Sequence, residues 1–427
     1  MLQKIDHIKW MFIICGLCFF SAQAQNVIRM PYSIYGIGMI NRSSNGILDA
    51  MGSTSYAMQD PYYINFRNPA SYAAFDSLSF IADVAASIYT SKLTQGDMIQ
   101  KNTYAKAHYL SIGLPVTRHW RTSLGILPFS SVGYNISSSS FIENIGKVNY
   151  TYSGSGGVNQ LYWGNAFKIC KGLSIGLNAS YMFGSLYYNS NTEIDGSNYD
   201  NSYVTDIFTV NGIYLTGGLQ YFFNIGEHHR IGLGVVYSNT AYIWAKEKLL
   251  VNSYSGTFVS TNTYDTVLNN QDINGSLIIP QSAGGGLSYT YKNKLTVAAD
   301  ITWEDWEKYK FTSKEDDYLK KAMTTSIGFQ YIPNPLSNKL FQRASIRAGA
   351  KYSTGNLILH NKPISEFSVC IGAGIPLTSF NTHSSLNILF EYGKTGTTTN
   401  ELIRQDYFRF SFCFTLQERW YQRFKID

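Results

Sequence analysis

Segments of about ten residues in which apolar and polar side chains alternate recur along this chain. The clearest is residues 408–416, where four phenylalanines and a leucine alternate with polar or small residues. Similar segments lie at residues 173–183, 231–238, 295–303, 345–352 and 386–393. A period of two places alternate side chains on opposite faces of a β-strand, and about ten residues suffice for a tilted strand to cross a bilayer. The repetition predicts a transmembrane β-barrel.

The connections between these segments alternate in length. Short connections lie near residues 117–119, 170–172, 226–229, 292–294, 334–341 and 377–384. Long polar connections lie near residues 91–103, 135–147, 189–206, 246–274, 310–320, 354–364 and 395–405. Short periplasmic turns and long outer loops are typical of bacterial barrels. Six turns and seven loops join fourteen strands, so we predict an all-β, antiparallel, fourteen-stranded barrel.

The composition agrees with a barrel and excludes other classes. Charged residues make up 15% of the chain, against about 25% in typical soluble domains, and aromatic residues make up another 15%. The formal net charge is +6 without a basic run, which argues against a nucleic-acid partner. Cys170, Cys370 and Cys413 are an odd set at wide spacing, so no disulfide framework is expected.

The first residues have the organisation of a secretory signal peptide. Basic residues precede an apolar run from Trp10 to Phe20, and small residues at 21–24 form an Ala-x-Ala cleavage site. The run is too short for a transmembrane helix; a buried core helix is the alternative. We predict a signal peptide at residues 1–24, cleaved after Ala24, and a location in the outer membrane of a Gram-negative bacterium.

Residues 25–77 show no strand alternation and contain several glycines and turn residues. A fourteen-stranded barrel leaves a hole if nothing fills it. We therefore predict that residues 25–77 form a plug, or hatch, inside a barrel made by residues 78–417. The alternative is a disordered periplasmic tail. Residues 418–427 are predicted to form a periplasmic C-terminal tail.

Several short motifs, in a fixed order, suggest a family. They are Asn68-Pro69-Ala70, Leu114-Pro115-Val116, Ile279-Pro280-Gln281-Ser282 with the glycine-rich 284–289, Ala299-Asp300 with Trp303 and Trp306, and residues 347–352. Together they resemble the FadL-type outer-membrane transporters of long-chain fatty acids and other hydrophobic compounds, over nearly all of the mature chain. The resemblance implies a hatch-bearing barrel for passive uptake.

Two groups of candidate site residues follow from this resemblance. In the family, a turn like Asn68-Pro69-Ala70 latches the hatch to the wall; an ordinary turn entering a strand is the alternative. Pro128, Phe129 and Gly133 interrupt the third strand, and proline in a wall strand removes a ladder hydrogen bond. We predict an inward kink and a lateral opening there, as in the family. A bulge at the outer rim is the alternative.

A third group consists of charges expected on the inner faces of strands. They are Asp300, Arg347, Lys351, Glu391 and Arg409. They could line a selective passage, or they could be paired groups that hold a plug in place. Charges are tolerated in a wet lumen but cost about 2–4 kcal/mol on the lipid face. Trp163, Trp303, Trp306 and Trp420 are predicted to lie in the interfacial aromatic girdles.

No catalytic, metal or cofactor motif is recognisable. The sequence contains no G-x-S-x-G elbow and no H-E-x-x-H motif, and the pair His228-His229 has no further ligand near it in sequence. We predict a non-enzyme without cofactor or metal, which takes up hydrophobic or amphipathic small molecules such as fatty acids. The alternative function is an accessory barrel subunit of an outer-membrane assembly or secretion complex, with other outer-membrane proteins as partners. A membrane enzyme, the third class, would need a His or an acid beside a Ser at the rim.

Overall fold

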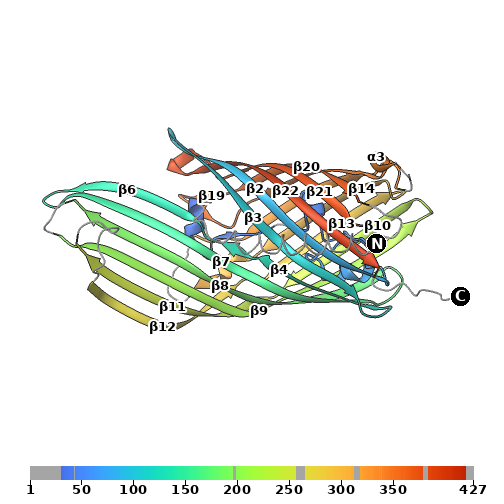
Figure 1. Ribbon diagram of the computed structural model, residues 1–427, viewed down its shortest axis with the longest axis horizontal. Coiled ribbons are helices and arrows are strands. Elements are labelled where there is room, and N and C mark those ends of the chain that lie inside the picture. The colour runs from blue at the N-terminus through green and yellow to red at the C-terminus, as the bar shows by residue number, and fades with distance from the viewer. Residues whose placement is uncertain are drawn as a thin grey trace, which may run out of the picture.

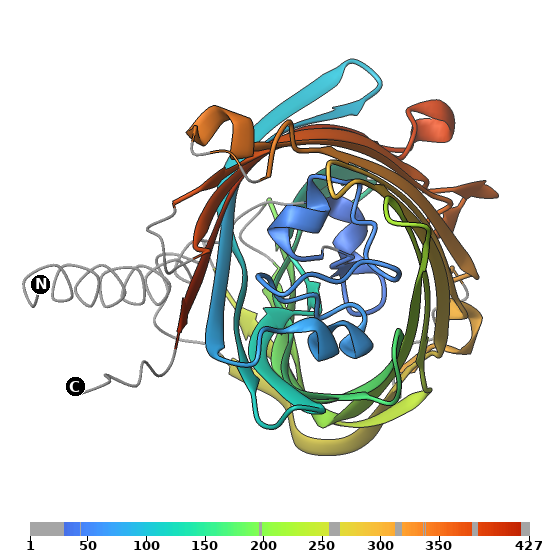
Figure 2. The ribbon, with the colours of Figure 1, turned by 90° about the vertical axis from the view of Figure 1, so that its right-hand side faces the viewer.

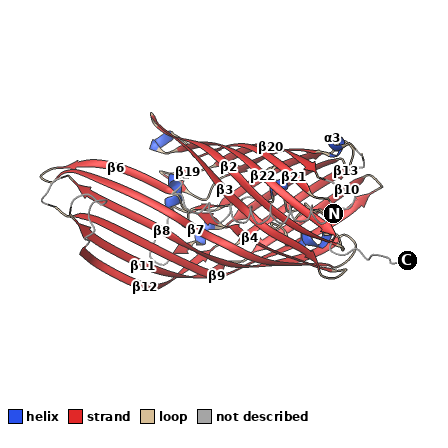
Figure 3. Cartoon of the chain, in the orientation of Figure 1, coloured by secondary structure: helices blue, strands red, loops and turns tan. Residues whose placement is uncertain are grey.

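A computed structural model describes residues 30–419, except 43, 196–198, 256–264, 312–317, 336, 338 and 378–382. The described chain is a closed antiparallel barrel of fourteen strands, as the sequence predicts (Figure 1). Strands make almost the whole wall, and only short helical turns accompany them (Figure 3). The predicted signal peptide lies outside the described residues.

The barrel closes between its first and last strands. β2 (Ser79–Gln95) pairs with β22 (Arg404–Arg419) from Ser79↔Arg419 to Thr94↔Arg404. The other wall strands are β3 (Met98–Pro115), β4 (Trp120–Pro128) continued by β6 (Tyr134–Ile142), β7 (Gly146–Lys168), β8 (Leu173–Ile194), β9 (Asn201–Ile225), β10 (His229–Ser238) continued by β11 (Ala241–Tyr254), β12 (Asp265–Ile279) continued by β13 (Ser282–Tyr291), β14 (Leu295–Glu304), β16 (Ala322–Tyr331), β17 (Ser345–Ser353), β20 (Glu366–Pro376) and β21 (Ser385–Thr395). The wall thus extends two residues beyond the predicted boundary at residue 417.

The strand register separates a lipid-facing surface from the interior. On β22, Phe408, Phe410 and Phe412 are exposed, whereas Arg409 and the other alternate residues are buried. The outer face is apolar because it meets hydrocarbon, and the polar face points inward. No helix in the described part of the chain is long and apolar enough to cross a membrane.

Four of the predicted outer loops are largely strand. Residues 91–103 form a hairpin whose turn is only Gly96-Asp97, and residues 135–147, 189–206 and 246–274 extend neighbouring strands. β7, β8 and β9 contain 23, 22 and 25 residues, whereas a tilted crossing needs about ten. These strands therefore project beyond the bilayer. Both of their faces meet water there, so they lose the alternation that marks a membrane strand.

The N-terminal segment from Met30 to Asp76, called the plug below, lies inside the barrel (Figure 2). It contains η1 (Pro31–Ile34), β1 (Met39–Ile40), α2 (Gly46–Asp49) and η2 (Pro69–Ala74). Most of its side chains are buried, including Leu48 and Met51 with no exposed surface. Burial on this scale requires the plug to be packed against the wall rather than suspended in water.

The outer mouth of the barrel is filled by a large apolar cluster. Met30, Tyr32 and Ile37 of the plug pack there with wall residues and with the connections between β14 and β21. These connections contain η3 (Trp306–Lys308), β15 (Lys310–Phe311), β18 (Ile358–Leu359) and β19 (Lys362–Pro363), and η4 (Thr399–Glu401) follows β21. At the opposite end, α3 (Leu340–Arg343) lies in a turn.

Trp306 belongs to this apolar cluster. Its side chain is 3% exposed, so its predicted place in an aromatic girdle is wrong. The strand β14 ends at Glu304, two residues earlier, and the chain then folds inward over the lumen. Trp163 and Trp303 are exposed on the wall. Trp420 and the rest of the predicted tail beyond Arg419 lie outside the described residues.

Candidate functional site

The Asn68-Pro69-Ala70 turn contacts the inner face of the wall. The Asn68 side chain caps η2 by accepting the N–H of Ala70 at 3.1 Å, and Pro69 occupies the first position, where no donor is needed. The Asn68 amide donates to the carbonyl oxygen of Tyr56 at 2.7 Å and to that of Leu219 on β9 at 3.4 Å. The turn is fully buried, and it lies against the glycines of two wall strands.

Glycines on the inner face of the wall let the plug backbone lie directly against the strands. A Cβ atom added at these glycines would overlap the plug: Gly176 and Pro69, Gly218 and Asn68, Gly234 and Tyr56, Gly328 and Met51, Gly349 and Gly52. Any larger residue at these positions would push the plug away from the wall. The five glycines lie on five different strands, so the plug is fitted to the wall around much of the barrel.

The lumen-facing charges on the last strands form a buried network with the plug. Arg409 pairs with Glu391 of β21 and, at 3.1 Å, with Asp49 of α2. Asp49 also accepts hydrogen bonds from the N–H and hydroxyl of Ser44 and from the hydroxyl of Ser53. Burial acts to raise the pKa of Asp49, but the charge of Arg409 and the hydrogen bonds from Ser44 and Ser53 act together in the opposite direction, and the pKa is lowered. The plug and the wall are therefore held by ionised partners.

The other predicted charges also lie on the inner face. Asp300 of β14 accepts the backbone N–H groups of Ser55 and Tyr56, the second at 2.9 Å. Arg347 of β17 donates to Gln330 and Asn387, at 2.7 and 2.8 Å. Lys351 lies 3.4 Å from Glu366. Asp300 thus contacts the plug, whereas Arg347 and Lys351 contact side chains of other wall strands.

Asp83 is a wall side chain that contacts the plug and that the sequence analysis missed. It lies on the inner face of β2, fully buried, and accepts hydrogen bonds from Asn45 of the plug and from the hydroxyl of Thr415 at 3.0 Å. Cys413 also donates to it, at 3.3 Å. The sequence did contain a sign of this position, because Asp83 is an acidic residue in an alternating segment that also contains Ile81 and Ala85. Cys370 and Cys413 are both free thiols.

The third strand is broken where Pro128, Phe129 and Gly133 lie. β4 ends at Pro128, and a two-residue strand β5 (Ser130–Ser131) bends inward to pair with β1 of the plug. Gly133 is bonded to η1, since its N–H donates to the Ser33 hydroxyl and its carbonyl accepts the N–H of Met30. The chain returns to the wall at β6. The interruption thus places part of the wall in contact with the plug.

Because of this break, β3 and β6 diverge toward the outer side. In the described part of the chain, β3 pairs with β4 only from Leu110↔Ile126 to Pro115↔Arg121, and β6 pairs only with β7. Figure 1 shows β3 rising with β2 while β6 runs with β7 into the projecting sheet. Val132 and Tyr134, next to the gap, are 2% and 5% exposed and belong to the apolar cluster. Side chains therefore fill the interior behind the gap.

A small cavity lies beside the break. Its volume is about 140 Å³, and Leu127, Phe129 and Tyr162 line it together with Arg42, Arg67 and Glu304. Arg42 pairs with Glu304 at 2.8 Å, and Arg67 donates to the Tyr56 hydroxyl at 3.0 Å. An apolar cavity of about 150 Å³ is large enough for a benzene ring. This one carries three charged side chains.

Comparison with known proteins identifies the family. The sequence model of the BamG family matches residues 1–427, the whole chain. The chain belongs to the BamG family. A search of curated proteins finds no match to this BamG-family sequence.

Solved structures similar to this BamG-family barrel share its fold. The Pseudomonas putida toluene transporter TodX is 17% identical, with a TM-score of 0.60, covering 90% of this chain and 100% of TodX. The Ralstonia pickettii toluene transporter TbuX is 13% identical, with a TM-score of 0.58, covering 89% and 99%. A Pseudomonas aeruginosa FadL homologue is 12% identical, with a TM-score of 0.57, covering 90% and 100%. The expected resemblance to FadL-type transporters is confirmed for the fold.

The described residues contain no group of three or more His, Cys, Asp or Glu side chains that could hold a metal ion. The charged groups of the lumen described above contact the plug or other side chains of the wall.

Proposed function

We propose that this outer-membrane barrel is an accessory subunit of a larger outer-membrane protein assembly, in which the barrel is a plugged anchor and its outer projections contact partners. One observation carries the proposal: the interior of the barrel is occupied. The buried plug is paired with the wall, and apolar side chains pack together at the outer mouth. Membership in the BamG family supports the same function. Small-molecule passage would need the plug and this apolar cluster to move.

Such a movement would break many contacts at once. The Arg409–Asp49 ion pair, the Asp300 contacts with Ser55 and Tyr56, and the hydrogen bond from Asn68 to Leu219 would all be lost. Breaking one buried ion pair alone costs about 3–5 kcal/mol. Moreover, ligand pockets usually enclose about 300–1,000 Å³, whereas the cavity beside the strand break encloses about 140 Å³.

The projecting sheet offers surfaces to partners. It consists of the outer parts of β7, β8, β9 and β11, with β6 and β12 at its edges. Among the described residues, β6 pairs only with β7, and β12 contacts β15 only at Leu277 and Ile278, so the outer part of each edge strand has no described strand on its other side. Phe141 near the end of β6 is 80% exposed, and Val267 of β12 is 67% exposed. Free edges and exposed apolar side chains are favourable for contacts with another protein.

The test is extraction of the tagged native protein in a mild detergent, followed by size analysis and mass spectrometry of bound proteins and lipids. We expect a stoichiometric complex with other outer-membrane proteins and no tightly bound apolar molecule. A variant with Phe141→Ser and Val267→Ser should lose partners while remaining a folded barrel. A lone barrel that carries a fatty acid or an aromatic compound would refute the proposal.

Passive uptake of hydrophobic or amphipathic molecules is the second candidate. The break between Pro128 and Gly133 favours it, because a ligand could leave sideways through the gap between β3 and β6. The fold is also that of the solved toluene transporters. Uptake predicts that bound apolar molecules are recovered in the same extraction, and that lengthening the hydrogen-bonded part of the third strand by Pro128→Thr reduces uptake.

A further inference from the structure

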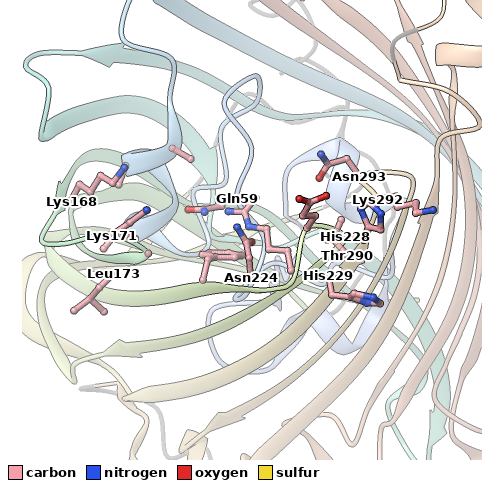
Figure 4. Close-up of a pocket in the computed structure, with 17 residues that line it drawn as sticks. Gln59, Lys168, Lys171, Leu173, Asn224, His228, His229, Thr290, Lys292 and Asn293 are labelled. Atoms are coloured by element: carbon pink, nitrogen blue, oxygen red, sulfur yellow. The ribbon is translucent and has the colours of Figure 1, made fainter.

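A second cavity opens at the end of the barrel that carries the short turns, which is the periplasmic end of a barrel of this topology. Its volume is about 420 Å³ (Figure 4). The plug contributes Gln59, Ala73 and Ala74 to its lining. The rest comes from three neighbouring turns, at residues 168–174, 222–230 and 290–293. The cavity thus lies between the plug and the rim of the wall.

The lining is strongly basic. Four side chains carry a positive charge, namely Lys168, Lys171, Arg230 and Lys292, whereas Glu227 is the one acid that lines it. The formal charge of the lining is therefore +3, from four positive and one negative group, with His228 and His229 neutral. Asp60 of the plug interacts electrostatically with Arg230. A concave surface of one sign attracts and concentrates ligands of the opposite sign.

The cations are available to a ligand. Among the described residues, none of the four forms a salt bridge. The three lysines are exposed, and Arg230 is half-buried. The Arg230 guanidinium lies 4.4 Å from the centre of the Phe222 ring, which limits its movement. The site therefore presents one guanidinium packed on an aromatic ring and three exposed ammonium groups.

The position of the cavity favours a soluble ligand over a lipid. Its wall residues Ser174 and Phe222 are turned toward the interior, where Ser174 is buried. The neighbouring Tyr221, 41% exposed, faces the opposite, lipid side. A lipid that remained in the bilayer would be separated from the cations by the strands. A segment of a periplasmic protein could enter from the water.

We propose that this basic cavity binds an acidic peptide segment of a periplasmic partner. Carboxylate side chains would pair with Lys168, Lys171, Arg230 and Lys292, and the guanidinium of Arg230 can bind a carboxylate with two parallel hydrogen bonds. The inference rests on the proposed function, because it names the chemistry by which one partner of the assembly is recognised.

The test measures binding of a fluorescent hexaglutamate peptide to the purified full-length protein in detergent, by fluorescence anisotropy. The charge-reversed variant Lys171→Glu with Lys292→Glu should bind at least about tenfold more weakly, since each reversal replaces an attraction by a repulsion. The control is Lys101→Glu with Lys394→Glu, which makes the same change of net charge at exposed lysines outside the cavity. The control should bind as the unmodified protein does, and raising the salt concentration should weaken binding in both.

Several results would overturn the inference. The first is that hexaglutamate does not bind to the unmodified protein, and the second is that the two charge-reversed variants bind it equally weakly. The third is that short-chain phosphatidylglycerol binds in a way that depends on Lys171 and Lys292, while the peptide does not bind. The last result would assign the cavity to a lipid headgroup. If the peptide does not bind but the partner proteins still co-purify, the proposed role of the cavity is refuted and the proposed function is not. Peptide binding by a protein that co-purifies with no partner refutes the proposed function alone.

Discussion

Arg409 on the last strand of the wall lies 3.1 Å from Asp49 in the only α-helix that the structure describes in the plug. The same guanidinium contacts Glu391. The substitution Arg409→Gln leaves the buried carboxylates of Asp49 and Glu391 without their cation, so we expect a loss of about 3–5 kcal/mol of stability. Thermal unfolding in detergent measures this loss. Arg404→Gln is the control: Arg404 pairs with Asp406 and is 32% exposed, so its loss should cost less than about 1 kcal/mol. Equal effects of the two changes would contradict the importance of the network.

Gly234 tests whether the plug is fitted to the wall. A Cβ atom there would overlap the carbonyl group of Tyr56, which is backbone and cannot rotate away. We expect Gly234→Ala to displace the plug and to raise the conductance of the barrel in planar bilayers, since an unfilled fourteen-stranded barrel encloses a channel. Gly285→Ala on the paired strand is the control, because its Cβ would meet no atom closer than 3.9 Å. Unchanged conductance in Gly234→Ala would show that the plug tolerates displacement at this point.

Substitutions of Asn68 should change the stability of the protein in an order that differs from the order at an ordinary helix N-cap. Asn68→Ser keeps a good capping oxygen and should have a small effect, whereas Asn68→Ala should cost about 1 kcal/mol. Asp is usually a good cap, but here the second oxygen of Asn68→Asp would replace an amide that donates to the Tyr56 carbonyl at 2.7 Å. Asn68→Asp should therefore be the most destabilising of the three. Melting temperatures in detergent give the order, and a best rank for Asn68→Asp would rule out the donor role.

The sequence predicts the wall better than the interior. Alternation marks each membrane crossing, because lipid imposes an apolar residue at every second position, and it places Asp300, Arg347 and Arg409 on the inner face. The projecting parts of β7, β8 and β9 were predicted as loops, because no lipid imposes a pattern on them. Trp306 was misplaced because aromatic residues serve equally in a girdle and in a packed core.

The partners inside the barrel could not be predicted. The pairing of Asp49 with Arg409 joins residues 360 positions apart, and the contact of Asn45 with Asp83 depends on how the plug is turned within the wall. The inner glycines, such as Gly234 and Gly349, are visible in the sequence, but glycine is also frequent in strands that contact nothing. Only the fold shows which glycines the plug backbone touches.

Asp60 in the plug gives a pH dependence. Burial raises its pKa to about 6, while the N–H of Tyr62 and the charges of Arg347 and Arg230 act in the opposite direction. Its ordinary pKa is 3.8, so the unfolded chain ionises at a lower pH than the folded protein. Stability from this group is therefore complete below about pH 4 and is lost as the pH rises through about 6. Asp60→Asn removes this titration and keeps an oxygen for the Tyr62 N–H. We expect the melting temperature of Asp60→Asn to exceed that of the unmodified protein by more at pH 7.5 than at pH 4. A larger increase in melting temperature at pH 4 would show that the folded protein prefers the ionised form of Asp60.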